Sequence, residues 1–572
     1  MLLLAEIAGP RKGLELMDWL GVGLYLVVTF VIVVWASRRQ NDTEEYFLGS
    51  RRIPWIAVGM SLLATLLSTI TYLGSPGEMI KNGITMFAGY MAIPFSMVVV
   101  LFLWMPFFMR LKMTSAYEYL ENRFDSRVRF IASVLFLLLR LGWMSLVVYT
   151  ASLALHKMAF AGTEVQLNHV IACVSIAATI YAFMGGIEAV IWNDVLQFIM
   201  LFGGTFVTII YIAYATGTGP MDWWDIAKAN SEKHVRPEFF SWDITVRMTI
   251  VTAMLHNFFW TICTHGSDQV VLQRYFSTTS LKAARKSYIV NEISGVAIGS
   301  LLGLSGLALF AFYTKHPNFL ANDMTIKTSS DDILPYFFAH QLPAGFGGLI
   351  LAGFLCDAMQ TLESGVNSIT AILTRDVFTQ VVQRTNNKIT ELFMARILTA
   401  IAGLTVMFLA FGVANTVQES KAEAQRISDQ VKLVTETHGI EAAKKIDQPV
   451  PKSIVDLMPR SFNMFLGPLA SMFVVGMFLP RCTGRSMIPA VFFGLFVSIT
   501  WSYWREICAL IGNIYPAIIP WGAKAPTITM AIALPFVSSC LVAAILGLLV
   551  ERRRDENPGR AYTWFEVMKR PI

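Results

Sequence analysis

The sequence has 572 residues, of which 55% are hydrophobic and only 15% charged, and its mean hydropathy is +0.56. An ordinary soluble domain has roughly 25% charged residues, so a soluble globular enzyme is excluded. The 45 basic and 39 acidic residues give a net charge of +6, which is too mild to indicate a nucleic-acid partner. The composition indicates that the lipid bilayer is the main solvent of this protein.

Long apolar runs recur along the whole chain. A hydrocarbon core about 30 Å thick needs about 20 apolar residues per helix, and scanning for such runs predicts about 13 transmembrane helices. These are residues 17–37, 54–80, 83–109, 130–156, 167–184, 189–216, 246–270, 288–313, 345–374, 392–414, 461–480, 486–506 and 526–550. The predicted fold class is therefore an all-α polytopic membrane protein, with one transmembrane domain over 1–550 and a short tail over 551–572.

Lys and Arg indicate the orientation of these helices, because positive residues near helix ends resist translocation. They gather after the first, third, seventh, ninth, eleventh and thirteenth helices, while Arg11 and Lys12 oppose this pattern weakly. The pattern predicts a multi-pass protein of the plasma (inner) membrane, with the N-terminus outside and the C-terminus in the cytoplasm. The pattern also makes residues 416–447 a polar extracellular insertion, rich in Ala, Glu, Lys and Gln. This insertion is either an amphipathic surface helix or a solvated segment without a function of its own.

Two predicted helices contain helix-breaking or polar stretches at corresponding positions. The second carries Gly74, Ser75, Pro76 and Gly77, and the seventh carries a polar run over 264–268. Pro removes a backbone donor and Gly permits unusual backbone angles. Interrupted spans in two corresponding halves point to a transporter with a binding site near the midplane. We predict breaks at Leu73 to Gly77 and at Thr264 to Ser267 that face one shared cavity; simple kinks without function are the alternative.

Four segments resemble the sodium:solute symporter family. They are GGIEAVIWNDVLQ (Gly185 to Gln197), DQVVLQR (Asp268 to Arg274), TSAYEYLENRF (Thr114 to Phe124) and NSITAILTRD (Asn367 to Asp376). The resemblance covers about residues 17–550. It implies the leucine-transporter fold, with a 5+5 inverted repeat over 54–216 and 246–480, one helix before it and two after it.

The resemblance also implies a sodium site. In the family, two backbone carbonyls of the first broken helix and a pair of hydroxyls in the ninth helix wrap the ion. The carbonyls correspond to Ala64 and Leu67, whereas the hydroxyl pair corresponds to Gln360 and Thr361, so only Thr361 keeps a hydroxyl. Asp357 stands one turn earlier, where it is an ion ligand, a proton carrier, or an acid paired for packing. An acid within the membrane indicates function by default.

Asp194 resembles the family's aspartate near the sodium exit path, with Ser364 as its candidate neighbour. The two residues predict a possible second cation site. The alternative is a structural hydrogen-bond acceptor that anchors the sixth helix against the ninth.

Arg140 lies near the middle of the fourth helix, where an unpaired guanidinium costs several kcal/mol. Its planar fork suits a carboxylate, and relatives with carboxylated substrates are similar in placing an arginine before a glycine here, as in Arg140 to Gly142. The alternative is an internal salt bridge to Glu363 or Asp357. Further candidates for the substrate cavity are Thr71, Tyr72, Ser75, His256, Trp260 and Glu363; His256 alone is also typical of a hydrogen-bonded core histidine.

The sequence thus predicts a secondary active transporter that couples Na⁺ to symport of a small, anionic (carboxylate) solute by alternating access. Expected partners are that solute and the lipid bilayer, with no nucleic acid and no organic cofactor. The alternatives are an H⁺-coupled or uncoupled transporter of the same fold, or a transporter-like solute sensor. HExxH, GxSxG and paired metal-ligand histidines do not occur, so an intramembrane enzyme is not indicated.

Overall fold

The computed structural model of the protein describes residues 11, 13–37, 53–111, 113, 115–160, 162–182, 187–230, 232–321, 324–326, 329–382, 388–438, 457–512, 515, 518, 526–549 and 558–570. The first part of the chain forms α1 (Leu16–Ser37), α3 (Trp55–Leu66), α4 (Thr69–Asn82), η2 (Ile84–Ala92), α5 (Ile93–Val99), η3 (Val100–Trp104), α6 (Met105–Leu111), α7 (Ala116–Arg123), α8 (Ser126–Ala159), α9 (Leu167–Ala182), α10 (Ile187–Thr216), α11 (Pro220–Asn230) and α12 (Glu232–Val235). The second part forms α13 (Ile250–Ser267), α14 (Gln269–Phe276), α15 (Leu281–Lys315), η4 (Pro317–Phe319), α16 (Ser330–His340), α17 (Phe346–Val382), α18 (Lys388–His438), η5 (Pro459–Asn463), α21 (Met464–Phe478), α22 (Gly484–Ser502), α23 (Trp504–Gly512), η7 (Ile528–Met530), α25 (Ala533–Leu549), η8 (Pro558–Tyr562) and α26 (Trp564–Val567).

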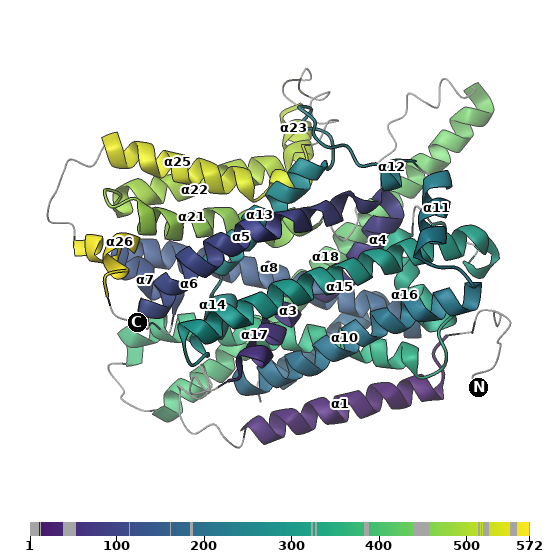
Figure 1. Ribbon diagram of the computed structural model, residues 1–572, viewed down its shortest axis with the longest axis horizontal. Helices are drawn as coiled ribbons and strands as arrows, with labels where there is room; N and C mark the ends of the chain where they lie inside the picture. Colours follow the sequence, from purple (N-terminus) through teal and green to yellow (C-terminus); the bar gives the residue numbers. More distant parts are fainter. Residues whose placement is uncertain are drawn as a thin grey trace.

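The long helices form one bundle and run mainly along its longest axis (Figure 1). α1 lies at one edge, where it packs against α17 and α10, and α22 and α25 lie at the opposite edge, where they pack against each other and α21. The N-terminal and C-terminal ends of the chain lie at opposite ends of the bundle in this view.

Each predicted apolar segment coincides with one helix or with consecutive helical segments. Among the described residues, nine helices are long and apolar enough to cross a membrane, and α3 with α4 forms a tenth, bent span. The all-α polytopic class is confirmed. The count of 13 crossings remains a prediction.

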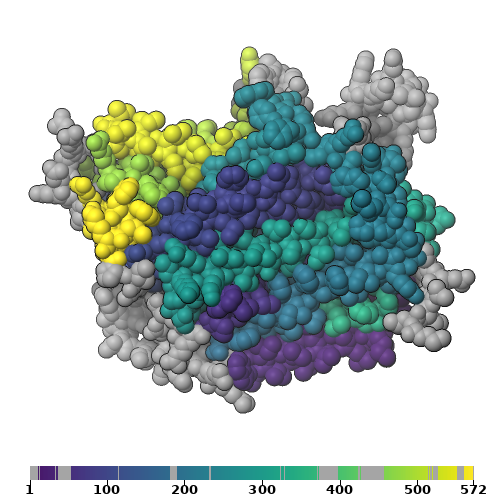
Figure 2. Space-filling view, viewed as in Figure 1, coloured from purple at the N-terminus to yellow at the C-terminus, as the bar shows by residue number. Residues whose placement is uncertain are grey.

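The edge helices keep large apolar side chains on their outer faces. On α1, Leu20, Leu24 and Val27 are exposed, and on α25, Leu541 and Leu548 are exposed. Figure 2 shows both helices at the rim of the molecule, with much of their surface uncovered. Such faces are stable in the hydrocarbon core of a bilayer, where all backbone groups of a helix are already paired.

The first broken helix is interrupted at Leu67 and Ser68, so the predicted break at Leu73 to Gly77 is misplaced. α3 and α4 meet at an angle of 63° across this point, and Leu73 to Gly77 lie inside α4 together with Pro76. Gly77 instead permits close packing: a Cβ there would lie 2.3 Å from Oδ1 of Asp331. Gly77 therefore serves a close helix contact, and none of these residues forms the break.

The second broken helix is interrupted at Asp268, immediately after the predicted stretch. α13 continues through Thr264 to Ser267, and Asp268 has extended backbone angles of φ −81° and ψ 117° before α14 begins. Gly266 allows Trp104 to pack on α13, because a Cβ would lie 2.8 Å from its Nε1. Both breaks exist, although neither lies at its predicted residues.

The predicted insertion over 416–447 begins as a continuation of a transmembrane helix. α18 extends without interruption to His438, and its C-terminal part projects from the bundle on the side of α11 and α12 (Figure 1). Residues 439–447 lie outside the described residues, and the extracellular location of the segment remains a prediction.

Gly142 marks a close approach of α8 to the turn η5. A Cβ at this position would lie 2.0 Å from the backbone carbonyl oxygen of Ser461. We expect Gly142→Ala to lower the melting temperature in detergent by an amount equivalent to about 1–3 kcal/mol, because the backbone must shift. Gly203→Ala is the control, since nothing lies within 4 Å of its Cβ position. Equal melting temperatures for the two variants would contradict the contact.

Candidate functional site

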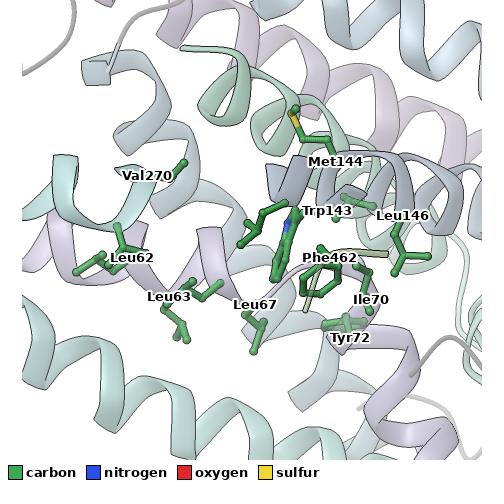
Figure 3. Close-up of a cluster of buried hydrophobic side chains, with 14 of the residues drawn as sticks. Leu62, Leu63, Leu67, Ile70, Tyr72, Trp143, Met144, Leu146, Val270 and Phe462 are labelled. Carbon is green, nitrogen blue, oxygen red and sulfur yellow. The ribbon is translucent and has the colours of Figure 1, made fainter. Parts of the chain in front are cut away.

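A small pocket lies between the two helix breaks. Leu66 reaches it from the end of α3, Thr264 from α13, Asp268 from the second break, and Arg140 from α8. The remaining lining residues are Leu139, Trp143, Trp260, Phe462 and Leu466. Figure 3 shows the apolar side chains around the first break, with Trp143 and Phe462 next to each other, and their ring centroids are 4.6 Å apart. The two breaks thus share a small pocket, but of the residues predicted to face a shared cavity, Leu73 to Gly77 and Thr264 to Ser267, only Thr264 lines it.

Arg140 forms a buried ion pair with Asp268. The side chains are each 4% exposed, and Nη2 of Arg140 donates to Oδ2 of Asp268. The guanidinium also lies 5.7 Å from the ring centroid of Trp143 and 5.9 Å from that of Phe136. Its Nε is buried and has no hydrogen-bond partner among the described residues. The predicted pairing of Arg140 with Glu363 or Asp357 was therefore wrong. Part of the hydrogen-bonding capacity of the guanidinium remains unused within the described part of the chain.

Asp268 serves two elements with its two oxygens. Oδ1 accepts a hydrogen bond of 2.9 Å from the backbone N–H of Val270, so Asp268 is the N-cap of α14. Oδ2 accepts from Arg140. An N-cap carboxylate is stabilised by the unpaired N–H groups and the positive end of the helix dipole. The second break is therefore connected directly to the arginine on α8.

The first break leaves helix-end carbonyls next to the same pocket. The carbonyl of Leu63 accepts 2.7 Å from the N–H of Leu67, and the chain then turns away, so the last carbonyls of α3 lose their helical partners. Ala64 and Leu67 are both buried and belong to this end. Thr361 is 9% exposed on α17, which packs against both α3 and α4. These groups are oxygen donors of the kind that Na⁺ prefers.

Asp357 belongs to α17, and its carboxylate lies against the N-terminus of α4. One oxygen accepts hydrogen bonds from the backbone N–H and the hydroxyl of Thr69, and the other accepts 2.8 Å from Nε2 of Gln197. Asp357 is 1% exposed. The carboxylate therefore caps the second half of the broken helix and joins α17 to α4 and α10, as the packing interpretation anticipated. Its roles as ion ligand or proton carrier remain predictions.

Asp194 and Ser364 surround a protein cation. Nη2 of Arg274 lies 3.1 Å from Oδ2 of Asp194 and 3.3 Å from Oγ of Ser364, and its Nε donates 2.8 Å to Ser61. Ser61 in turn donates to Asp194. The guanidinium thus lies between the two residues of the predicted second cation site and neutralises the aspartate. The anchoring of α10 against α17 anticipated for Asp194 passes through Arg274.

Glu363 is completely buried on α17, away from Arg140. Neither of its carboxylate oxygens has a hydrogen-bond partner in the described part of the chain, and Oε1 of the nearby Gln360 is also unpartnered there. Two of the acids on α17 are thus in different situations. Asp357 is fully hydrogen-bonded, whereas Glu363 is not.

The remaining substrate candidates divide into packing residues and pocket residues. The hydroxyl of Tyr72 accepts 2.8 Å from Thr205 and donates to the carbonyl of Leu201, so it is engaged with α10. His256 contacts the carbonyl oxygen of Thr529 through Nδ1 at 3.1 Å, as expected of a core histidine. Trp260 lines the pocket. Ser75 is buried, with a hydroxyl that has no partner among the described residues, and Thr71 is half-buried, one turn from the break.

Comparisons with known proteins agree with this architecture. The sequence model of the sodium:solute symporter family matches residues 46–431, which is more than half of the chain. The chain belongs to the sodium:solute symporter family. It is a transporter and not an enzyme.

Individual relatives of this symporter match over most of their length. A sodium/sialic acid symporter of Aliivibrio fischeri is 29% identical over 83% of this chain and 85% of its own. A sodium-dependent multivitamin transporter of Oryctolagus cuniculus is 28% identical over 97% of this chain and 80% of its own. A solved Na⁺-coupled sialic acid symporter in a substrate-bound, outward-open state superposes with a TM-score of 0.73, covering 94% of this chain and 98% of that one at 24% identity. The last comparison shows the shared fold.

The sequence did not assign a role to several residues of the symporter's site, although they lie within the recognised motifs. Asp268 and Arg274 are the first and last residues of DQVVLQR, and Gln197 ends the GGIEAVIWNDVLQ segment. Each makes a buried polar contact with another helix. Their polar side chains within apolar segments could have identified them from the sequence, because buried polar residues need partners within the bundle.

Proposed function

We propose that this symporter moves a small carboxylate solute across the membrane together with Na⁺, and that Arg140 receives the carboxylate. The observation that carries the proposal is a buried guanidinium in a pocket between two helix breaks, with an unpartnered Nε. A guanidinium has five N–H donors in a fixed fork that matches a carboxylate. One contact to Asp268 leaves donors for a ligand.

The rest of the pocket supports a substrate with both charged and apolar parts. Trp143, Trp260 and Phe462 provide flat apolar walls, and Thr264 provides a hydroxyl group. Relatives named for sialic acid, a carboxylated sugar, support the carboxylate assignment for this chain. Thr71, Ser75 and Trp260 remain candidates for contacts to the rest of the substrate.

Na⁺ is the proposed cargo at the first break. The carbonyls of Ala64 and Leu67 supply part of a coordination shell, and Thr361 on α17 supplies a hydroxyl. Asp357 would act from the N-terminus of α4, as a direct ligand or by holding Thr69. Ion binding would fix α3 and α4 against α17, and substrate binding would then allow the bundle to close over the pocket.

The proposed setting is the plasma (inner) membrane, with the N-terminus outside and the C-terminus in the cytoplasm. An H⁺-coupled transporter is the second candidate, because α17 carries two buried acids: Asp357, which contacts Thr69 at the first break, and Glu363, whose carboxylate oxygens have no partner among the described residues. Na⁺ and pH gradients imposed separately on proteoliposomes distinguish the two drivers.

The test of the carboxylate receptor is the replacement of Arg140. We expect Arg140→Ala to reduce binding of sialic acid, or of a short monocarboxylate, at least about 100-fold, because buried charge-assisted contacts are lost. Arg140→Lys should retain part of the charge attraction without the bidentate geometry. Binding is measured by calorimetry with Na⁺ present.

Arg127→Ala is the matched control for that test, because it removes the same charge from an exposed position of the same helix. It should leave binding unchanged. Binding of neutral sugars by the wild-type protein together with indifference to Arg140→Ala would reject the carboxylate assignment.

A further inference from the structure

The pocket between the breaks is electrically balanced before any substrate enters. Among the described residues that line it, Arg140 is positive, Asp268 is negative and the others are uncharged. Both charged side chains are 4% exposed and form one ion pair. The neighbouring cation Arg274 is paired with Asp194 in its own cluster. A substrate anion therefore meets a pocket with no net positive charge.

Adding a carboxylate to this pair would leave one uncompensated negative charge in a buried, low-dielectric site. Buried charges without compensation cost several kcal/mol. A monovalent cation at the first break offsets part of this cost, and the break is close: Leu66 lines the pocket, and Leu67 is the next residue in the chain. The anion and the cation would thus stabilise each other.

We infer that Asp268 is the residue that makes carboxylate binding depend on Na⁺. The inference rests on the proposed function. By neutralising Arg140, Asp268 keeps the affinity for an anion low until Na⁺ supplies the missing positive charge. Without the negative charge of Asp268, Arg140 alone would attract the carboxylate and the cation would no longer be needed for binding. Asp268 is a positioning residue on this account, since it acts through Arg140.

The two oxygens of Asp268 allow this role to be separated from its role in folding. Asparagine keeps an oxygen for the N–H of Val270, 2.9 Å away in the native protein, and it caps helices as well as aspartate does. It removes the negative charge that faces Arg140. Asp268→Ser, a second neutral capping residue, serves if the asparagine variant is unstable.

The experiment measures the dissociation constant of sialic acid by calorimetry, with Na⁺ and with choline at equal ionic strength. For the wild-type protein we expect Na⁺ to increase affinity about tenfold or more, within the usual range of coupling between two sites. For Asp268→Asn we expect affinity in choline to rise about tenfold and the effect of Na⁺ to fall below about twofold. Because coupling is reciprocal, sialic acid should also lose its effect on Na⁺ affinity in this variant.

Asp18→Asn is the matched control, because Asp18 is a buried acid whose carboxylate lies 2.8 Å from Arg11, and it belongs to α1 at the edge of the bundle and does not line the pocket. It should keep the wild-type dependence on Na⁺. Unchanged Na⁺ dependence in Asp268→Asn would overturn the inference, and so would an equal loss of affinity with and without Na⁺, which would make Asp268 a mere orienter of Arg140.

Failure of the proposed function has a different signature. If the wild-type protein does not bind sialic acid, or if Arg140→Ala binds it normally, Arg140 does not bind the substrate carboxylate. The inference about Asp268 is then rejected as well. If Arg140→Ala abolishes binding while Asp268→Asn behaves like the wild-type protein, only the inference is overturned.

Discussion

Asp357→Asn is expected to reduce Na⁺-driven uptake at least about tenfold while leaving the protein folded. Asp357 holds the N-terminus of α4 through the N–H and hydroxyl of Thr69, and it holds Gln197 with its other oxygen. The asparagine amide can accept at only one oxygen, so one of these donors would face an NH₂ group. Loss of a charge-assisted bond at a buried helix end costs about 1.5–3 kcal/mol. The carbonyls of the first break would lose their fixed geometry.

Initial uptake into proteoliposomes, with Na⁺ and pH gradients imposed separately, measures this effect. Asp125→Asn is the matched control: Asp125 caps α8 through hydrogen bonds of 2.9 Å to the N–H groups of Arg127 and Val128, outside the site. It should transport normally. Uptake that follows a pH gradient without Na⁺ would make H⁺ the coupling ion, and full activity of Asp357→Asn under both gradients would remove Asp357 from the mechanism.

The sequence predicts the helices well because each transmembrane helix needs its own apolar run, whatever its neighbours. Break positions depend on neighbours. Gly74 to Gly77 looked like the break, yet α4 includes them, and the interruption lies where the carboxylate of Asp357 can take the N–H of Thr69. These two residues are 288 positions apart. A local pattern of Gly and Pro contains no information about such a contact.

The site shows the same division. The cost of a buried charge predicts from sequence that Arg140 needs a partner, but it does not identify the partner. The sequence suggested acids on the ninth helix, whereas Asp268 lies at the second break. Asp194 was chosen as an ion ligand, and the helix packing brings the guanidinium of Arg274 to it. The cost of burying a charge predicts that a compensating charge must be present, but the residue that supplies it depends on the tertiary fold.

Replacing Arg274 is expected to cause a large loss of stability. The guanidinium is 1% exposed and donates to Asp194, Ser61 and Ser364, so Arg274→Met leaves a buried carboxylate without its cation. Removal of one partner of a buried pair costs about 3–5 kcal/mol. Thermal unfolding in detergent measures the loss. Lys569→Met is the control, because Lys569 and its partner Glu566 are 71% and 40% exposed and exposed pairs contribute about 0–1 kcal/mol.

The double variant Asp194→Asn/Arg274→Met separates the charge from the packing. It should be more stable than Arg274→Met alone, because no uncompensated carboxylate remains at position 194. If Arg274 takes the place of a second cation, Na⁺ should also raise the melting temperature of Arg274→Met more than that of the wild-type protein, since the ion can then neutralise Asp194. Equal stability of the single and double variants, with no added effect of Na⁺, would mean that the cluster is held by packing and not by its charges.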